Sequence, residues 1–93
     1  MPDYRNKRMK VIVCIKDTAA RVYGVPFVVQ AAAQAVRSLR DEVNSKDSTS
    51  DVCKHPSDFE LYELATFDED SGNIAPFELP QLLCRAKDLK ESD

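Results

Sequence analysis

Cys53 and His55 are the first residues whose types and spacing could do chemistry, and His55 is the chain's only histidine. A metal site takes three or four ligands in convergent geometry, and no second Cys–His pair accompanies this one. A Cys–His or Ser–His mechanism would have to use the same imidazole as its base. The sequence therefore favours a structural or solvent-exposed histidine, with metal binding or catalysis as the alternative.

An acidic run from Asp68 to Asp70 could bind a cation. Its spacing does not match an EF-hand loop, which needs ligands at alternating positions and a closing Glu. Two glycines in the whole chain are too few for a glycine-rich phosphate loop, and no nucleophile elbow is present. We interpret the acidic run as a solvated turn, and we expect no enzyme activity, no metal and no cofactor.

Basic residues of the first half form the third candidate. Lys10 and Lys16 share one face of a strand, because their separation is even, and Tyr23 follows in the next loop. Many proteins hold single-stranded nucleic acid on a sheet face, with phosphates on cations and bases on aromatic rings. The alternative is a solvated edge that keeps the protein soluble. The candidate nucleic-acid-binding residues are Arg5, Lys7, Arg8, Lys10, Lys16, Arg21, Tyr23, Arg37 and Arg40.

Charge is unevenly distributed along the chain, although the net charge is only −3. Residues 1–40 hold eight Lys or Arg against two Asp, whereas residues 41–93 hold five against fourteen Asp or Glu. Overall acidity argues against strong non-specific binding of nucleic acid, but the asymmetry permits one basic face. It equally permits a head-to-tail dimer.

Length and composition predict one small globular domain of 93 residues, with ordinary fractions of hydrophobic and charged residues. No apolar run is long enough to span a membrane, and residues 1–10 lack the apolar core of a signal peptide. Cys14, Cys53 and Cys84 are an odd, widely spaced set that fits a reducing cytoplasm. A chain this short is marginally stable alone, so we expect a homodimer.

The first half predicts two strands and a helix. "MKVIVCIKD" alternates as a strand, with Val11, Val13 and Ile15 on one face. "TAARVYGV" is typical of a loop or hairpin connection, with Gly24 available for a positive φ, and "PFVVQ" of a short strand. "AAAQAVRSLRDEVN" is the clearest helix. Its apolar stripe consists of Ala32, Val36, Leu39 and Val43, and Asn44 is its expected C-terminal stop.

The second half predicts a hairpin. After the polar loop "SKDSTSD", Pro56 disfavours helix at His55, and Ser57 or Asp58 can cap a short turn. "FELYELATF" then reads as a strand and "DEDSG" as a hairpin turn with Ser71 and Gly72 at its tight positions. The expected faces of this strand are Phe59, Leu61, Ala65 and Phe67 on one side, and Tyr62 and Leu64 on the other.

"NIAPFEL" is the expected return strand, with Pro76 at an edge or a bulge. After Pro80, "QLLCRAKDLKESD" predicts a short amphipathic helix or a tail, carrying Leu82, Leu83, Ala86 and Leu89. The order β-β-α-β-β predicts an α+β fold, a small antiparallel sheet with one main helix packed across it. We expect residues 1–8 to be a flexible basic arm, 9–79 a single domain, and 80–93 the tail or short helix.

From Met9 to about Ile74 the chain resembles a known family. "MKVIVCIKD", "YGVPF", a helix ending in "EVN" and "KHPSDFELYELATFDEDSGNI" are similar to the small non-structural protein of gokushoviruses. These are single-stranded DNA bacteriophages of the microvirus group. The most specific part is His-Pro-x-Asp-Phe, followed by a Leu-Tyr strand and an acidic hairpin with Gly. The matching residues are Tyr23, Pro26, Phe27, His55, Pro56, Asp58, Phe59, Leu61, Tyr62, Phe67, Asp68 and Gly72.

The resemblance implies a protein of the host bacterial cytoplasm that is not part of the virion. Members of the family are described as DNA-binding and linked to the production of single-stranded genomes. The family has no established catalytic residues, so none is carried over, and the matching residues are mostly determinants of the fold. Its pattern begins near Met9, so the basic arm stands outside the resemblance.

We therefore expect non-catalytic binding of single-stranded DNA, with affinity that falls as salt rises. Lys10, Lys16, Arg21, Arg37 and Arg40 would contact phosphates, and Tyr23 would stack on bases. The alternative is an adaptor or regulator of a viral or host replication or assembly protein. Its contact surface would be the acidic second half, and "LPQLLCRAKDL" would dock in a partner's groove as an amphipathic helix.

Overall fold

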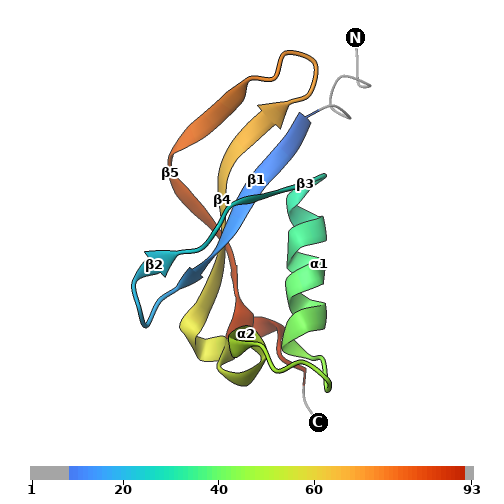
Figure 1. Ribbon diagram of the computed structural model, residues 1–93, viewed down its shortest axis with the longest axis vertical. Coiled ribbons are helices and arrows are strands. Elements are labelled where there is room, and N and C mark those ends of the chain that lie inside the picture. The colour runs from blue at the N-terminus through green and yellow to red at the C-terminus, as the bar shows by residue number, and fades with distance from the viewer. Residues whose placement is uncertain (1–8, 92–93) are drawn as a thin grey trace.

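A computed structural model describes residues 9–91 of the chain (Figure 1). The expected basic arm, with Arg5, Lys7 and Arg8, lies outside the described residues. The fold is α+β, as the sequence predicts, with a curled antiparallel sheet and one main helix. Its strands are β1 (Met9–Asp17), β2 (Val22–Tyr23), β3 (Phe27–Val29), β4 (Phe59–Asp68) and β5 (Ile74–Arg85). Its helices are α1 (Ala32–Val43), the single turn α2 (Asp51–Lys54), and the 3-10 helices η2 (Pro56–Asp58) and η3 (Ala86–Leu89).

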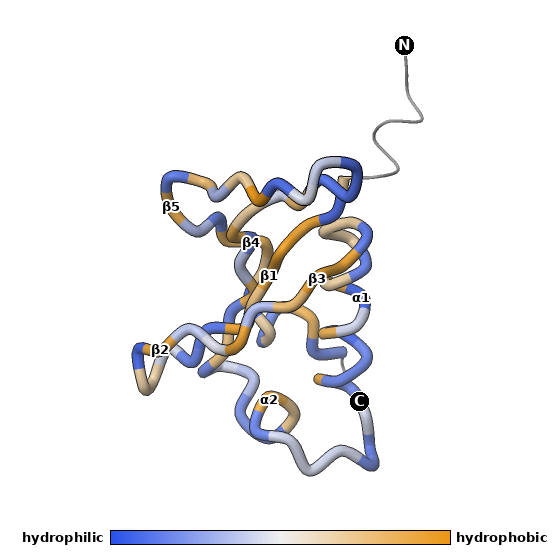
Figure 2. The backbone as a smooth tube through the Cα atoms, turned by 45° about the horizontal axis from the view of Figure 1, so that its top comes forward, coloured by the Kyte–Doolittle hydropathy of each residue, from blue (hydrophilic) through white to orange (hydrophobic). Residues whose placement is uncertain are grey.

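The strands are arranged in the order β2-β1-β4-β5, and β3 also pairs with β1 (Figure 2). Three strands rather than two precede α1, so the predicted order β-β-α-β-β is wrong and the observed order is β-β-β-α-β-β. The extra strand is β2, which pairs with Lys16 and Asp17 at the end of β1. The sequence pattern missed it because two residues are too few to show an alternation.

The turn between β1 and β2 uses its residues differently from the prediction. Arg21 is in the left-handed region, with φ of 62°, whereas Gly24 does not have the positive φ expected for it. Gly24 is needed for a close approach instead, because its N–H donates to the Ile15 carbonyl oxygen at 2.7 Å. A Cβ at this position would lie 2.8 Å from the same oxygen. Because Gly24 has no side chain, its N–H can reach the Ile15 carbonyl oxygen, and this hydrogen bond helps to hold the end of β2 against β1.

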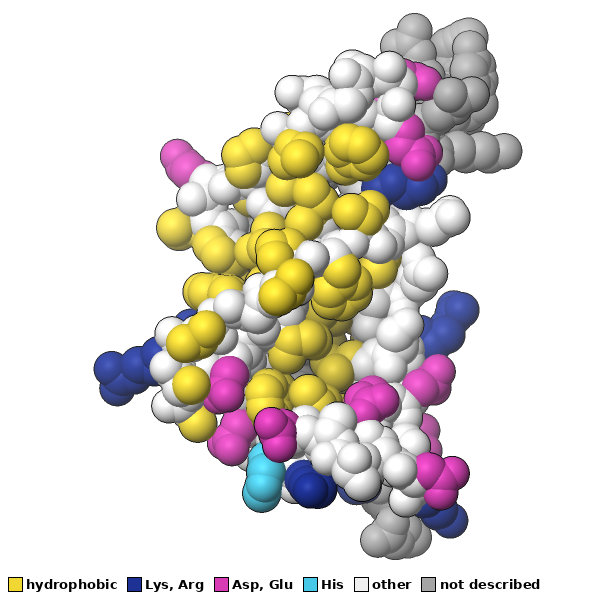
Figure 3. Space-filling model, viewed as in Figure 1, with side chains coloured by type: hydrophobic (Ala, Val, Ile, Leu, Met, Phe, Trp, Pro, Cys, Tyr) yellow, Lys and Arg dark blue, Asp and Glu magenta, His cyan; other side chains and the backbone are white. Residues whose placement is uncertain are grey.

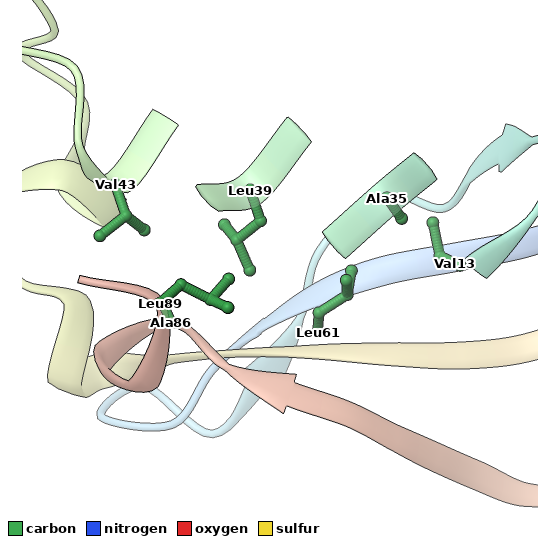
Figure 4. Packing of buried hydrophobic residues seen from close by; sticks show 7 residues of the cluster. All are labelled: Val13, Ala35, Leu39, Val43, Leu61, Ala86 and Leu89. Carbon is green, nitrogen blue, oxygen red and sulfur yellow. The ribbon is translucent and has the colours of Figure 1, made fainter. Parts of the chain in front are cut away.

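Helix α1 packs its apolar stripe against one face of the sheet (Figure 4). Leu39 and Val43 are buried as predicted, but Ala35 rather than Ala32 completes the buried row. These side chains point toward Val13 of β1 and Leu61 of β4. Burial of apolar side chains between helix and sheet is the main stabilising term of a domain this small.

Asn44 ends α1, as predicted, and ties it to the C-terminal segment. Its Nδ2 donates to the carbonyl oxygens of Arg40 and Leu89, at 2.8 and 2.9 Å. Ala86 and Leu89 of η3 are buried in the same core as the helix. The C-terminal segment is therefore part of the core.

A β-bulge in β4 changes which residues share a face. Ile12 pairs with Ala65 and Val13 pairs with Glu63, so Leu64 is an extra residue on β4. Side chains alternate along a strand, and one extra residue moves all following residues to the other face. Leu61 consequently faces α1, whereas Ala65 and Phe67 lie on the opposite face with Ile12. The prediction that Leu61, Ala65 and Phe67 share one face is wrong for this reason.

Strand β5 does not end before Pro80. It continues to Arg85, so the helix expected after Pro80 is wrong for residues 81–85, and only the 3-10 helix η3 follows. Pairing with Tyr62, Glu63 and the neighbouring residues of β4 holds this stretch extended. As the last strand of the sheet, β5 is an edge, which agrees with the expectation for Pro76.

The β4–β5 turn is as the sequence predicts. Gly72 has φ of 76° and donates its N–H to the Asp68 carbonyl oxygen at 2.7 Å. The Asp68 carboxylate accepts the Asp70 N–H at 2.8 Å. The first acidic residue thus shapes the turn.

Candidate nucleic-acid interface

Cys53 and His55 do not meet in a catalytic or metal-binding arrangement. The Cys53 thiol donates to the carbonyl oxygens of Val43 and Ser45, at 3.6 and 3.2 Å, and helps to hold α2 beneath the end of α1. His55 is exposed and lies between α2 and η2. Helix α2 is capped by Ser50, whose hydroxyl accepts the Cys53 N–H. The next turn, η2, has no side-chain cap, so the cap expected from Ser57 or Asp58 does not form. Residues 9–91 contain no group of three or more His, Cys, Asp or Glu side chains placed to hold a metal ion.

The other two cysteines are ordinary apolar groups. Burial raises the pKa of the Cys14 thiol, and burial is also the largest influence raising the pKa of the Cys84 thiol. A reactive cysteine needs the opposite shift, toward the thiolate. In the described part of the chain, no helix is long and apolar enough to cross a membrane.

The sheet face turned away from α1, here called the open face, carries the predicted cationic and aromatic residues of the strands. Lys16 pairs with Tyr23 of β2 on one side and with Glu60 of β4 on the other. Glu60 in turn pairs with Arg85 of β5. Because directly paired residues point to the same face, these four side chains form one row across the end of the open face.

Lys16, Tyr23 and Tyr62 form what we call the Lys16–tyrosine cluster. The two rings pack edge to face, with centroids 5.4 Å apart and planes at 70°. The Lys16 ammonium lies 4.8 Å from the Tyr23 centroid and 5.9 Å from that of Tyr62. Both distances are within the range of a cation–π interaction. Lys16 makes no ion pair with a carboxylate among residues 9–91, and its ammonium lies over the two rings instead.

Glu60 is the anionic group of this row. Its carboxylate accepts the Tyr62 hydroxyl at 2.8 Å and lies 3.4 Å from the Arg85 Nε. The hydrogen bond to Glu60 is the largest influence raising the pKa of the Tyr62 phenol. Tyr62 therefore stays neutral at physiological pH.

The structure separates the predicted basic residues into three places. Lys10 and Lys16 share the open face, as expected, but the Lys10 ammonium lies 3.2 Å from Glu69 of the hairpin turn. Arg21 is exposed in the β1–β2 turn, next to the cluster. Arg37 and Arg40 are exposed on α1, which packs on the other face of the sheet. A single contact surface therefore includes Lys16, Arg21 and Tyr23 but not the two helix arginines.

Sequence reasoning did not include Tyr62 and Arg85 among the candidate site residues. Tyr62 joins Lys16 only through the β1–β4 register, and Arg85 joins the row because β5 runs past Pro80. One signal was available in the sequence: Glu60 and Tyr62 have the even spacing that puts both on one face of a strand.

Comparisons with known proteins agree on one family. Residues 10–89 match the family model described as Phage ORF5 protein. The Protein ORF5 of Chlamydia phage 1 is 34% identical over 64 residues, which cover 67% of this chain and 67% of that protein. No solved structure gives a significant match.

Proposed function

The chain belongs to the Phage ORF5 protein family of gokushoviruses, and from this premise we propose that it binds single-stranded DNA without catalysis. The observation that carries the proposal is the Lys16–tyrosine cluster on an uncovered sheet face. Exposed rings beside a cation are the chemistry with which proteins hold unpaired bases and their phosphates. The role is in genome replication or single-strand production, in the host cytoplasm and outside the virion.

Tyr23 is the group that would stack on a base. It lies on the two-residue edge strand β2, and 43% of it remains exposed although it packs against Tyr62. Tyr62 supports it from the side, and Lys16 is close enough to bind a phosphate next to the stacked base. Stacking on an aromatic side chain contributes about 1–3 kcal/mol per base and depends little on sequence.

Arg21 extends the cluster toward solvent. A non-glycine residue in the left-handed region costs about 1–2 kcal/mol, and Arg21 has this conformation in the turn beside Tyr23. Such a conformation is found where the surrounding structure or a function maintains it. We assign Arg21 to a second phosphate contact, with Lys10 further along the open face.

A role as a protein-interaction adaptor is the second candidate, since the open face also exposes apolar side chains. The C-terminal helix expected to dock in a partner's groove is not present in that form. "LPQLLCRAKDL" is not a free amphipathic helix, because Ala86 and Leu89 are buried in the protein's own core and residues 81–85 pair with β4. Truncation after Leu79 would remove Ala86 and Leu89 from the core, so loss of partner binding in that variant would not distinguish a lost contact from unfolding. An adaptor would use the acidic surface of the second half or the apolar side chains of the open face.

The test is fluorescence anisotropy of a labelled single-stranded oligonucleotide at low and moderate salt, with duplex DNA of equal length as reference. We expect preference for the single strand, and a logarithmic salt slope of about −0.7 per phosphate contacted. Replacing Lys10, Lys16 and Arg21 together by Glu should abolish binding. The matched control replaces Lys46, Lys54 and Lys87 by Glu, which changes net charge equally at exposed sites away from the cluster.

Two results would contradict the proposal. One is absence of binding to the single strand even at low salt. The other is an equal loss of affinity in the two triple variants, because that would show a response to net charge alone. Tyr23→Leu distinguishes stacking from charge, since it keeps every cation and should still weaken binding roughly 5- to 150-fold.

A further inference from the structure

We infer that the apolar part of the open face is an interface with a second copy of this chain. The strand register brings together one set of side chains on this face, here called the apolar patch. It consists of Ile12, Val28, Phe67, Ile74, Pro76 and Leu82. Figure 3 shows hydrophobic side chains gathered over the strands, with charged side chains mostly at their margins.

The patch is uncovered within residues 9–91, because α1 packs on the other face of the sheet. Val28, Ile74 and Leu82 remain 54%, 55% and 41% exposed. An apolar sheet face is normally buried against a second layer.

The size of the patch suits a dimer. If a free side chain presents roughly 150 Å² or somewhat more, as the smaller aromatic ones do, the six residues of the patch leave on the order of several hundred Å² of apolar surface in water. A standard interface takes about 800 Å² from each partner, and about 65% of a homodimer interface is apolar. The apolar area needed is thus of the same order, about 500 Å².

Charge also favours a second copy as the occupant. Lys10 and Arg85, at the two ends of the patch, are paired within the chain with Glu69 and Glu60. Lys16 adds one cation at the end of the open face, where the rings of the cluster contact it. The patch itself consists of uncharged side chains, so two identical patches can approach without strong repulsion. A partner selected by charge would need an unbalanced surface of one sign.

Pairing through the sheet edge is a poorer way to form the dimer. Pro76 and Pro80 remove two N–H donors from the edge strand β5. The pairing also passes from Gln81 directly to Pro76, so residues 77–80 bulge out of the ladder. Prolines and bulges are the usual means of protecting an edge strand from pairing with another chain. Face-to-face stacking leaves this protection intact.

A two-fold axis through the patch is compatible with the proposed DNA contacts. The row with Lys16 and Tyr23 lies at one end of the open face, and the row with Lys10 and Phe67 lies at the other. If the axis runs across the strands, the two copies carry their Lys16–tyrosine clusters at opposite ends of the dimer. One DNA strand could then contact both clusters, with an affinity raised by the linkage of the two sites.

The test is sedimentation velocity of the full chain over a range of concentrations, with Leu82→Lys and Leu82→Asp as variants. Neither charge can be buried between two copies, so we expect both variants to weaken association at least 100-fold. The control is Ala33→Asp, which places a carboxylate at an exposed apolar residue of α1, and it should sediment as the wild type does. Circular dichroism establishes that each variant is folded.

The wild type is expected to sediment with twice its monomer mass of 10.5 kDa. A wild type that stays monomeric at about 100 μM would overturn the inference and favour a different partner for the patch, because specific homodimers are usually far tighter. Dimers that persist in both Leu82 variants would place the interface elsewhere. If a Leu82 variant does not fold, Ile74→Lys at the hairpin end of the patch replaces it.

The inference and the proposed function fail separately. Ile74→Lys should lose the dimer yet still bind a short oligonucleotide, because Ile74 pairs with Phe67 at the end of the open face away from the cluster and the variant adds a cation. Tyr23→Leu should weaken DNA binding and keep the dimer, because it changes no charge on the open face and Tyr23 is not part of the apolar patch. Loss of both properties in both variants would show misfolding, which the circular dichroism spectra would reveal.

Discussion

Gly24→Ala is the substitution that connects the fold to the candidate site most directly. The Gly24 N–H donates to the Ile15 carbonyl oxygen at 2.7 Å, and an added Cβ would lie 2.8 Å from the same oxygen. The added Cβ would meet a backbone atom, which cannot turn aside as a flexible side chain can, so the β1–β2 connection has to move. Tyr23 precedes Gly24, and its ring would then leave Tyr62 and Lys16.

The expected cost is about 1–3 kcal/mol for the steric conflict and about 0.5–1.5 kcal/mol for the weakened hydrogen bond. Alanine also lowers the conformational entropy of the unfolded chain, which offsets about 0.4–1 kcal/mol of this cost. A net destabilisation of about 2 kcal/mol follows. Gly72→Ala is the matched control, because Gly72 has open space around it and only its φ of 76° opposes a side chain.

The assay is urea unfolding of both glycine variants and the wild type at one protein concentration, since association would shift the midpoints. We expect Gly72→Ala to cost about 1 kcal/mol and to leave the Tyr23 ring resonances unchanged. Gly24→Ala should cost more and should shift those resonances. Equal stability of the two variants, or an unmoved Tyr23, would refute the argument that close approach at Gly24 positions the cluster.

Three further predictions concern the turn, the core and the loop after α1. Arg21→Gly should raise the free energy of unfolding by about 0.5–1 kcal/mol, because glycine removes the strain of the left-handed conformation. The same variant should bind DNA more weakly in the anisotropy assay. Unchanged stability would contradict the argument that Arg21 is strained. Leu61→Ala should cost about 2–5 kcal/mol in urea unfolding, because its fully buried side chain packs against α1 and η3. Hydrogen bonds from the Ser48 and Ser50 hydroxyls lower the pKa of Glu42, so their stabilising effect is present above the ordinary pKa of 4.5 and is lost as pH falls through the lowered value. The stability advantage of wild type over Glu42→Gln, measured by thermal unfolding, should therefore shrink with acidification; a constant difference would contradict this.

Much of the fold followed from local sequence patterns. Alternation of apolar residues located β1, a helical apolar stripe with Asn44 at its end located α1, and Gly72 marked the turn of the last hairpin. Each of these features depends on a few consecutive residues and on the conformations their backbones allow, so a single sequence is enough to predict them. The same patterns placed Lys10 and Lys16 together on one face of a strand.

Only the tertiary structure decided which strands meet and in which register. The bulge at Leu64, the short strand β2 and the extension of β5 to Arg85 all depend on pairing between distant segments. Local sequence does not determine that pairing, because a shift of one residue exchanges the two faces of a strand at little local cost. The sequence therefore determined that this chain has a helix-covered sheet with basic and aromatic residues in its first half. Packing decided that Tyr62 joins Lys16 and Tyr23, that Arg37 and Arg40 lie apart from them, and that one apolar face of the sheet stays open.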